Sequence, residues 1–547
     1  MTAKIIERTP SAVDQPLVIH SILEAGVRNA PEQEIVYADK KRMSYREFGE
    51  RIHRLASALN KAGVKPGDTV AVMDWDSHRY LECFFAVPMM GAILHTINVR
   101  LSPEQILYTI NHAEDDVILV NREFLPLLDA IKNRIETVKT FVLLDDGEGP
   151  ESSKIDTAGE YEALLADADA SFEFPLLDEN TRATTFYTTG TTGLPKGVYF
   201  SHRQLVLHTF AARAALGGDG HGRFNQNDVY MPITPMFHVH AWGIPFLAVL
   251  LGVKQVYPGR YLPEVLLKLL ITEKVTFSHC VPTIMQMLLA SEAVKKVDLT
   301  KWKVIIGGSA LPKPMARAAL DLGIDIYTGY GMSETCPLLT LSHMMPHMAE
   351  WDLDRQAEVR SRTGRAVPMV TLRIVDENMQ DVPHDGKSQG EVVARAPWLT
   401  QGYLKDEKNS EQLWQGGWLH TGDIGVMDAD GYLKITDRIK DVIKTGGEWI
   451  SSLDLEGLVL QHSGVAECAV IGMPDAKWGE RPLALVVKKP DSTATEEEIR
   501  ELVAGYAEKG VISKYGIPEN IKFVDELPRT SVGKLDKKAM RAEHLPA

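Results

Sequence analysis

The sequence predicts an α/β protein with a large N-terminal region of mostly parallel sheets and a small α/β C-terminal domain. Short β-rich runs alternate with segments of helical length along most of the chain, which is the pattern of parallel strands covered by helices. The chain has 547 residues, and at about 150 residues per domain it should contain more than one folded unit. Hydrophobic residues make up 44% and charged residues 24%, as in ordinary globular proteins with a large core.

Local signals place the first elements. Ser102, Pro103 and Gln105 are typical of an N-cap, a first-turn proline and a capping box, and they predict a helix that runs to Asn111. The polar, acidic segment 145–170 is predicted to be a surface loop. Compact apolar runs bounded by turn residues predict strands over 69–73, 117–120, 140–144, 254–257, 276–278 and 304–308.

The segment 231–253 has no Asp, Glu, Lys or Arg and is long enough to span a bilayer. It contains Pro235, His238 and His240, which a lipid-facing helix accommodates poorly. We therefore predict a buried strand, a loop and a core helix there, and no integral membrane segment.

Charge and cysteine content restrict the class of protein. The chain has 59 Lys and Arg against 74 Asp and Glu, a net charge of −15 that repels nucleic-acid backbones, so no nucleic-acid partner is expected. The four cysteines lie far apart without a C-x-x-C pair, which argues against a disulfide scaffold and a cysteine zinc site. The first residues include Glu7 and Asp14 and show no apolar signal segment, so a cytoplasmic location is expected.

The character of the sequence changes near Asp437. Downstream, the sequence predicts a helix over 452–461, a second helix opened by a capping box at Thr495, and strands over 466–472, 483–488 and 521–524. About 110 residues with such elements can form a small domain. We therefore expect an N-terminal domain over residues 1–438 and a C-terminal domain over residues 439–547.

The most informative segment is 188–197, Thr-Thr-Gly-Thr-Thr-Gly-Leu-Pro-Lys-Gly. Glycines let backbone N–H groups approach an anion, hydroxyls add donors and Lys196 adds charge, so the composition suits a triphosphate. It is not a Walker A motif, because Pro195 precedes the lysine and Gly197 follows it. A flexible surface loop is the other interpretation.

Together with four further segments, this loop resembles the adenylate-forming superfamily of acyl-CoA synthetases, firefly luciferase and peptide-synthetase adenylation domains. The resemblance runs from about Ile22 to Arg541, and its further segments are 235–242, 330–335, 417–441 and 528–534. Segments 94–98 and 445–451 are most similar to bacterial medium- to long-chain fatty-acyl-CoA ligases. The resemblance implies a small β-barrel-like subdomain and a mobile C-terminal domain. It also implies an ATP-dependent ligase that converts a fatty acid to acyl-CoA through an acyl-adenylate, releasing AMP and pyrophosphate.

The resemblance further implies which residues act on the acid and on ATP. Attack of a carboxylate on the α-phosphate brings two anions together, at a cost on the order of several kcal/mol in a partly dry site. Lys534 is implied to bridge the two anions, and Glu334 and Thr188 are implied to bind Mg²⁺. Taken alone, Lys534 is typical of a solvated basic tail and Glu334 of a helix-capping carboxylate.

Other residues are implied to surround the nucleotide. Asp423 can accept from two ribose hydroxyls, and Arg438 can donate to the same sugar or to a phosphate. The resemblance implies that Tyr330 packs on the adenine and that Thr335 donates to the α-phosphate. Asp423 is equally typical of an Asx-turn. The expected binding residues are Thr188, Thr189, Gly190, Thr191, Thr192, Gly193, Lys196, Val239, Trp242, Gly308, Ser309, Thr328, Gly329, Tyr330, Gly331, Ser333, Thr335, Asp423, Arg438, Lys440, Lys444, Gly446, Gly447, Trp449 and Lys534.

One site must serve two half-reactions, because the thiol of coenzyme A attacks the acyl-adenylate next. The resemblance implies that the C-terminal domain rotates about Lys440 and withdraws Lys534. Many relatives carry aspartate at the hinge position. Lys440, Lys444 and Trp449 are then implied to contact the nucleotide, and Gly446 and Gly447 to line the pantetheine tunnel.

Trp242 is implied by the resemblance to close the mouth of the acyl tunnel, and a plain core tryptophan is the other interpretation. Three other functions remain open: a ligase for a short functionalised acid such as a methylthio or aryl carboxylate, an adenylating module that loads a carrier protein in trans, and a non-catalytic acyl-nucleotide binder. The expected partners are a fatty acid, ATP, Mg²⁺ and coenzyme A, and the resemblance implies a homodimer.

Overall fold

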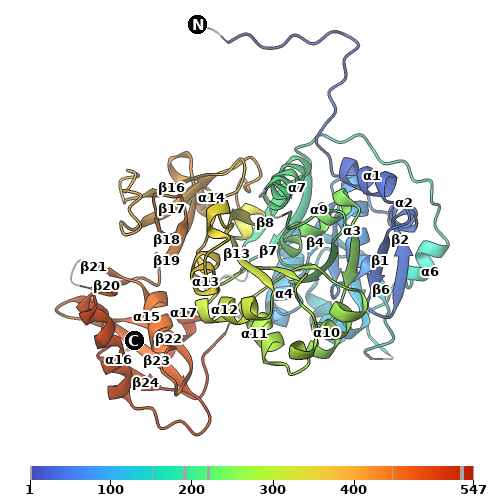
Figure 1. The fold of residues 1–547 in the computed structure, drawn as a ribbon. Helices are drawn as coiled ribbons and strands as arrows, with labels where there is room; N and C mark the ends of the chain where they lie inside the picture. The colour runs from blue at the N-terminus through green and yellow to red at the C-terminus, as the bar shows by residue number, and fades with distance from the viewer. Residues whose placement is uncertain are drawn as a thin grey trace.

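The computed structural model describes residues 3–150, 152–188, 194–218, 222–445, 448–529 and 535–545. Two large sheets form the N-terminal region, and a four-stranded sheet adjoins them (Figure 1). A five-stranded sheet forms a separate, smaller C-terminal domain below the four-stranded sheet in this view. The predicted α/β fold is confirmed.

The first large sheet has six strands in the order β6-β5-β3-β4-β7-β8. All neighbouring pairs are parallel except β7 and β8, which form an antiparallel hairpin. The strands are β3 (Thr69–Met73), β4 (Ile93–Thr96), β5 (Asp115–Asn121), β6 (Thr140–Leu144), β7 (Arg182–Tyr187) and β8 (Gly197–Ser201).

The second large sheet has nine strands in the order β15-β14-β13-β12-β11-β9-β10-β1-β2. Its central strands are parallel, and antiparallel strands stand only at its two ends. The strands are β1 (Glu34–Tyr37), β2 (Lys41–Ser44), β9 (Val229–Ile233), β10 (Lys254–Tyr257), β11 (Phe277–Cys280), β12 (Lys303–Ile306), β13 (Asp325–Gly331), β14 (Leu338–Leu341) and β15 (Arg365–Ala366).

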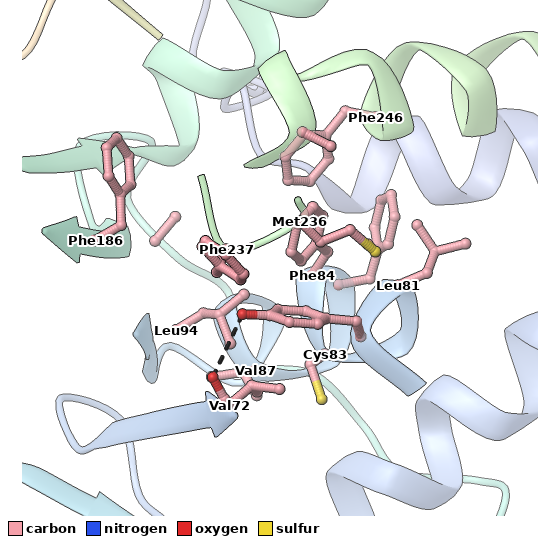
Figure 2. Close-up of a cluster of buried hydrophobic side chains, with 14 of the residues drawn as sticks. Val72, Leu81, Cys83, Phe84, Val87, Leu94, Phe186, Met236, Phe237 and Phe246 are labelled. Carbon is pink, nitrogen blue, oxygen red and sulfur yellow. Dashed lines mark hydrogen bonds between the residues drawn. The ribbon is translucent and has the colours of Figure 1, made fainter. Parts of the chain in front are cut away.

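Helix α3 (His78–Met89) lies between the two sheets, because it contacts β4 and β7 of one and β1 of the other. Every residue of this helix is buried, as expected for a helix covered on all sides. Its charged residues are paired: Arg79 donates to Asp146 at 2.8 Å and Glu82 accepts from Arg51 at 2.6 Å. Figure 2 shows its apolar side chains, including Leu81 and Phe84, in a buried cluster where Phe84 stacks on Phe246.

The predicted barrel-like subdomain is a four-stranded antiparallel sheet. It consists of β16 (Thr371–Val375), β17 (Gly390–Arg395), β18 (Leu419–Met427) and β19 (Leu433–Arg438). The C-terminal domain has its own core, which includes Ile443, Val470 and Val486. Its elements are β20 (Ile443–Thr445), β21 (Glu448–Ile450), β22 (Val465–Asp475), β23 (Gly479–Lys488), β24 (Asn520–Phe523), α15 (Ser452–Val459), α16 (Glu496–Glu508) and α17 (Lys537–His544).

Several local predictions are confirmed. Helix α4 (Pro103–Ala113) begins after the Ser102 capping box, and the segment from 231 forms the end of β9, a loop and α9 (Ile244–Leu251). Among the described residues, no helix has the length and apolar character needed to cross a bilayer. All four cysteines are buried and free.

One prediction for the N-terminal region is wrong. The segment 145–170, expected to be a loop, contains helix α6 (Tyr161–Ala166). The carboxylate of Glu160 caps this helix by accepting from the backbone N–H of Ala163 at 2.9 Å, and Tyr161 and Leu165 are buried. Tertiary burial of two apolar side chains stabilises a helix too short to persist alone.

Candidate active site

The candidate site lies at the carboxyl ends of parallel strands, the usual position of ligand sites in open α/β sheets. Strands β9, β11, β12 and β13 are parallel neighbours, so the segments that follow them meet at one edge of the sheet. Trp242 follows β9, Gly308 follows β12, and Glu334 follows β13. The fold therefore brings residues from two of the segments that carried the family resemblance together with Gly308.

Thr188 and Lys196 face each other across the hairpin of β7 and β8. The backbone N–H of Thr188 donates to the carbonyl of Lys196 at 2.9 Å, and the N–H of Lys196 donates to the Thr188 hydroxyl at 3.3 Å. These bonds close the base of the predicted phosphate loop. Thr189, Gly190, Thr191, Thr192 and Gly193 lie outside the described residues.

Glu334 is a buried carboxylate beside Lys196. Its side chain accepts from the hydroxyl of Tyr403 at 2.7 Å, and the ammonium of Lys196 lies 4.5 Å from the centre of the Tyr403 ring. Glu334 is 6% exposed, and burial raises the pKa of its carboxyl, while the Tyr403 hydroxyl and the charges of Lys196 and Arg438 oppose this rise. A desolvated carboxylate of this kind gains from a bound cation.

Asp423 joins two predicted nucleotide-binding residues. Its Oδ2 accepts from the Tyr330 hydroxyl at 2.7 Å, and its Oδ1 lies 3.3 Å from Nε of Arg438. Asp423 and Arg438 are opposite each other in the β18–β19 ladder, so the backbone register fixes this pair. Burial raises the pKa of Tyr330 well above its ordinary value, so its hydroxyl stays a donor to Asp423.

Gly331 and Thr335 shape the turn that carries Glu334. A Cβ on Gly331 would lie 1.5 Å from the carbonyl oxygen of Pro337, so no other residue fits this close approach. The buried hydroxyl of Thr335 accepts from the Met332 N–H at 3.0 Å and donates to the carbonyl of Pro337. Its predicted donation to a phosphate therefore requires a change of partner, because a hydroxyl has a single proton.

Trp242 packs against β11 and against the residue that follows β12. Its indole stacks on the imidazole of His279 with ring centres 5.0 Å apart, and a Cβ on Gly307 would lie 2.8 Å from Trp242 Cη2. Val239 to Trp242 all have positive φ, and a left-handed conformation costs roughly 1–2 kcal/mol per residue. Strained backbone of this kind clusters at functional sites. Gly308 and Ser309 are exposed at the rim.

His279 was not predicted as a site residue. Its Nε2 lies 2.7 Å from the Tyr230 hydroxyl and its Nδ1 lies 3.1 Å from the Thr234 hydroxyl. Burial lowers the pKa of His279 to about 3, so the ring is neutral. With both nitrogens engaged, it offers Trp242 a flat face with no free polar group.

Three other predicted residues, Thr328, Gly329 and Ser333, make mainly structural contacts near the site. The Thr328 hydroxyl donates to the carbonyl of Arg360 at 2.9 Å, which is a structural bond. Gly329 lies against Ile305, and Ser333 begins the turn before Glu334. Tyr403 is a site neighbour that the sequence did not reveal, because it lies in an irregular segment without periodicity.

Lys444 and Trp449 of the C-terminal domain are not brought to this edge. Lys444 lies opposite Trp449 in the β20–β21 pair, with its ammonium 5.3 Å from the indole. Figure 1 shows β20 and β21 on the far side of the C-terminal domain from β7 and β8. Lys440 is exposed in the connection from β19, and Gly446, Gly447 and Lys534 lie outside the described residues.

Comparison with known proteins identifies the family of the chain. The family model described as AMP-binding enzyme matches residues 23–404, and that of the AMP-binding enzyme C-terminal domain matches residues 454–534. A long-chain-fatty-acid–CoA ligase of Thermus thermophilus is 40% identical over 541 residues, covering 97% of this chain and 96% of the relative. A 3-methylmercaptopropionyl-CoA ligase of Ruegeria lacuscaerulensis is 39% identical over 540 residues, covering 97% of each.

Among solved structures, ATP-bound MatB from Rhodopseudomonas palustris superposes with a TM-score of 0.83 at 25% identity, covering 97% of this chain and 99% of that one. The chain therefore belongs to the family of AMP-binding enzymes. Within it, the chain is an AMP-forming acid–CoA ligase, an enzyme whose co-substrates are ATP and coenzyme A.

Proposed function

We propose that the acid is a medium- to long-chain fatty acid. The observation that carries this proposal is Trp242, whose indole lies over Gly307 and stacks on the hydrogen-bonded, neutral His279. A surface formed mostly by the faces of aromatic rings favours an alkyl chain. The relative of Thermus thermophilus bears a fatty-acid name, whereas that of Ruegeria favours the second candidate, a short functionalised acid.

The first half-reaction makes the acyl-adenylate. In our proposal the loop from Thr188 to Lys196 binds the phosphates, and Asp423 accepts from the ribose hydroxyls. Lys534 bridges the acid and the α-phosphate. Arg438 lies close enough to Asp423 to hold its carboxylate in place.

Mg²⁺ is proposed to bind with the triphosphate. No cluster of three or more His, Cys, Asp or Glu side chains that could hold a metal occurs in the part of the chain that the structure describes. Glu334 and the Thr188 hydroxyl nevertheless fit Mg²⁺, which takes few protein oxygens when it also binds substrate phosphates. When bound, the ion neutralises charge on the phosphates, and Glu334 holds it from a desolvated position.

The second half-reaction requires a different face of the C-terminal domain. We propose a boundary after residue 438 and a rotation about Lys440 that withdraws Lys534 and presents Lys444, Trp449, Gly446 and Gly447 to the nucleotide and the pantetheine arm. The separate core of the C-terminal domain supports such a rigid-body movement. Trp242 is proposed to swing away from the tunnel mouth when ATP binds.

A series of straight-chain acids tests the substrate proposal. We expect kcat/KM, from ATP- and CoA-dependent AMP release, to rise by about fourfold per buried methylene until the tunnel is filled. A maximum at methylthio or aryl acids would overturn the fatty-acid assignment. Acyl transfer to a carrier protein but not to free coenzyme A would establish a loading module instead.

Glu334→Gln tests the metal proposal. We expect the Mg²⁺ concentration for half-maximal activity to rise by about tenfold, because an amide is a weaker ligand for a hard cation than a carboxylate. Tyr403→Phe is the matched control, since it removes the 2.7 Å hydrogen bond but leaves the carboxylate. An Mg²⁺ titration of Glu334→Gln that coincides with the wild-type curve would contradict the assignment.

We further propose a cytoplasmic homodimer. The reduced state of four buried cysteines supports a reducing compartment, and the resemblance to fatty-acyl-CoA ligases supports the dimer. Light scattering of the purified protein measures the oligomeric state directly.

A further inference from the structure

The connection between the two domains is a closed turn around Lys440. The carbonyl of Arg438 accepts from the N–H groups of Asp441 at 2.9 Å and Val442 at 2.8 Å. Just before the pivot, the N–H of Ile439 donates to the carbonyl of Gly422 at 2.9 Å, which ties that residue to β18. The chain entering Lys440 is therefore held by the N-terminal region.

Just after the pivot, an arginine of the last helix holds the chain. Nη2 of Arg541 in α17 donates to Oδ1 of Asp441 at 2.7 Å and to the carbonyl of Lys440 at 3.1 Å. The Arg541 and Asp441 side chains are only 27% and 12% exposed. Their charge-assisted contact is therefore partly shielded from water and salt.

Helix α17 is itself fixed within the C-terminal domain. The ammonium of Lys537 lies 2.6 Å from both the Glu456 carboxylate and the Ser452 hydroxyl, and Met540 is fully buried. Arg541 therefore grips the connection from a rigid support. The segment that contains Lys534 leads directly into this helix.

Bond connectivity decides which contacts survive a rotation. Turning φ or ψ of Lys440 moves its own carbonyl together with all later residues, so both contacts of Arg541 persist. The bonds from Asp441 and Val442 to the Arg438 carbonyl cross the pivot and must break. Three more contacts cross it: Ser451 Oγ donates to the Thr436 carbonyl, the Ser452 N–H donates to Asp437 at 2.6 Å, and the Lys434 ammonium donates to Asp454 at 3.0 Å.

We propose that Arg541 is a positioning residue of the hinge. By fastening the Lys440–Asp441 peptide to α17, it confines rotation to the two dihedrals of Lys440 and prevents Asp441 from acting as a second pivot. The C-terminal domain then moves along one path between its two orientations. This inference rests on the proposed rotation, and it adds the residue that limits the rotation to Lys440.

Arg541→Ala tests the clamp, with Lys538→Ala as the matched control, which removes an exposed cation from the same helix. Trypsin cleaves after lysine, so its cut after Lys440 reports local opening of the clamped peptide without any acyl substrate. We expect this cut to accelerate by about tenfold in Arg541→Ala, the effect of losing one shielded charge-assisted hydrogen bond. We expect the rate of this cut in Arg541→Lys to lie between those of the wild type and Arg541→Ala.

A double variant distinguishes a role of Arg541 in the hinge from a purely structural role, because only the hinge role predicts a gain in thioester formation. Lys440→Pro restricts the pivot, and we expect it to slow thioester formation from supplied acyl-adenylate far more than pyrophosphate exchange. Adding Arg541→Ala should restore thioester formation by about fivefold, because Asp441 then turns instead.

Three results would overturn the clamp: an unchanged rate of cleavage after Lys440, an equal acceleration in Lys538→Ala, or additive losses in the double variant. Thermal unfolding of each variant identifies a general loss of stability. Failure of the proposed function is recognised separately, because wild-type protein would then lack one of the two half-reactions while the cleavage result stands.

Discussion

Lys534→Ala is expected to lower acyl-adenylate formation by about a hundred- to a thousandfold, the range found when one preorganised transition-state donor is removed. The ammonium is proposed to lie between the attacking carboxylate and the α-phosphate, where its positive charge offsets the repulsion between the two anions. Thioester formation from supplied acyl-adenylate should stay within about threefold of wild type, because Lys534 is proposed to be withdrawn in that step.

The two half-reactions are measured separately, by pyrophosphate exchange without coenzyme A and by acyl-CoA formation from synthetic acyl-adenylate. Lys538→Ala is the control, since it removes a neighbouring exposed cation. Equal losses in both half-reactions would show that Lys534 supports the C-terminal domain rather than the first chemical step.

Asp423→Asn is expected to raise the KM for ATP by about thirtyfold or more. The two oxygens of the buried Asp423 carboxylate face different partners, Tyr330 and Arg438. An asparagine amide has only one acceptor oxygen, so it cannot accept from both. Loss of a charged acceptor from a buried network costs about 1.5–3 kcal/mol.

Comparison of ATP with 2′-deoxy-ATP distinguishes ribose recognition from a structural role. Wild-type enzyme should prefer ATP by about tenfold, the value of one hydroxyl donating to a charged acceptor, and Asp423→Asn should lose the preference. Tyr330→Phe, which removes the 2.7 Å bond but keeps the carboxylate, should retain it. A preference for ATP that survives in Asp423→Asn would refute the ribose assignment.

The elements that could be predicted are those whose signals lie within a few residues. The capping box of Ser102 and Gln105 starts α4 one residue later, and that of Thr495 starts α16 at Glu496. The predicted strand over 69–73 has the same first and last residues as β3. Helix α6 escaped prediction because its two buried side chains, Tyr161 and Leu165, are too few to show a helical period.

The site residues divide in the same way. Glycine, threonine and Lys196 in one short segment predicted phosphate binding by composition alone. Tyr403 and His279 have no such local signal, since one lies in an irregular segment and the other in a buried strand. They become site neighbours only because Glu334 and Trp242 are placed against them.

By itself the sequence determined the α/β class, the strand and helix signals, the adenylate-forming resemblance and the residue types that ATP chemistry needs, because each depends on neighbours along the chain. Only the tertiary structure decided which side chains meet. Tyr330 and Asp423 are 93 residues apart and Glu334 and Tyr403 are 69 apart, yet each pair shares a hydrogen bond. The physical reason is that these contacts join separate units, since the end of β13 and the turn after it meet the antiparallel strand β18 and an irregular segment near Tyr403. Such contacts depend on how sheets and segments pack together rather than on distance along the chain.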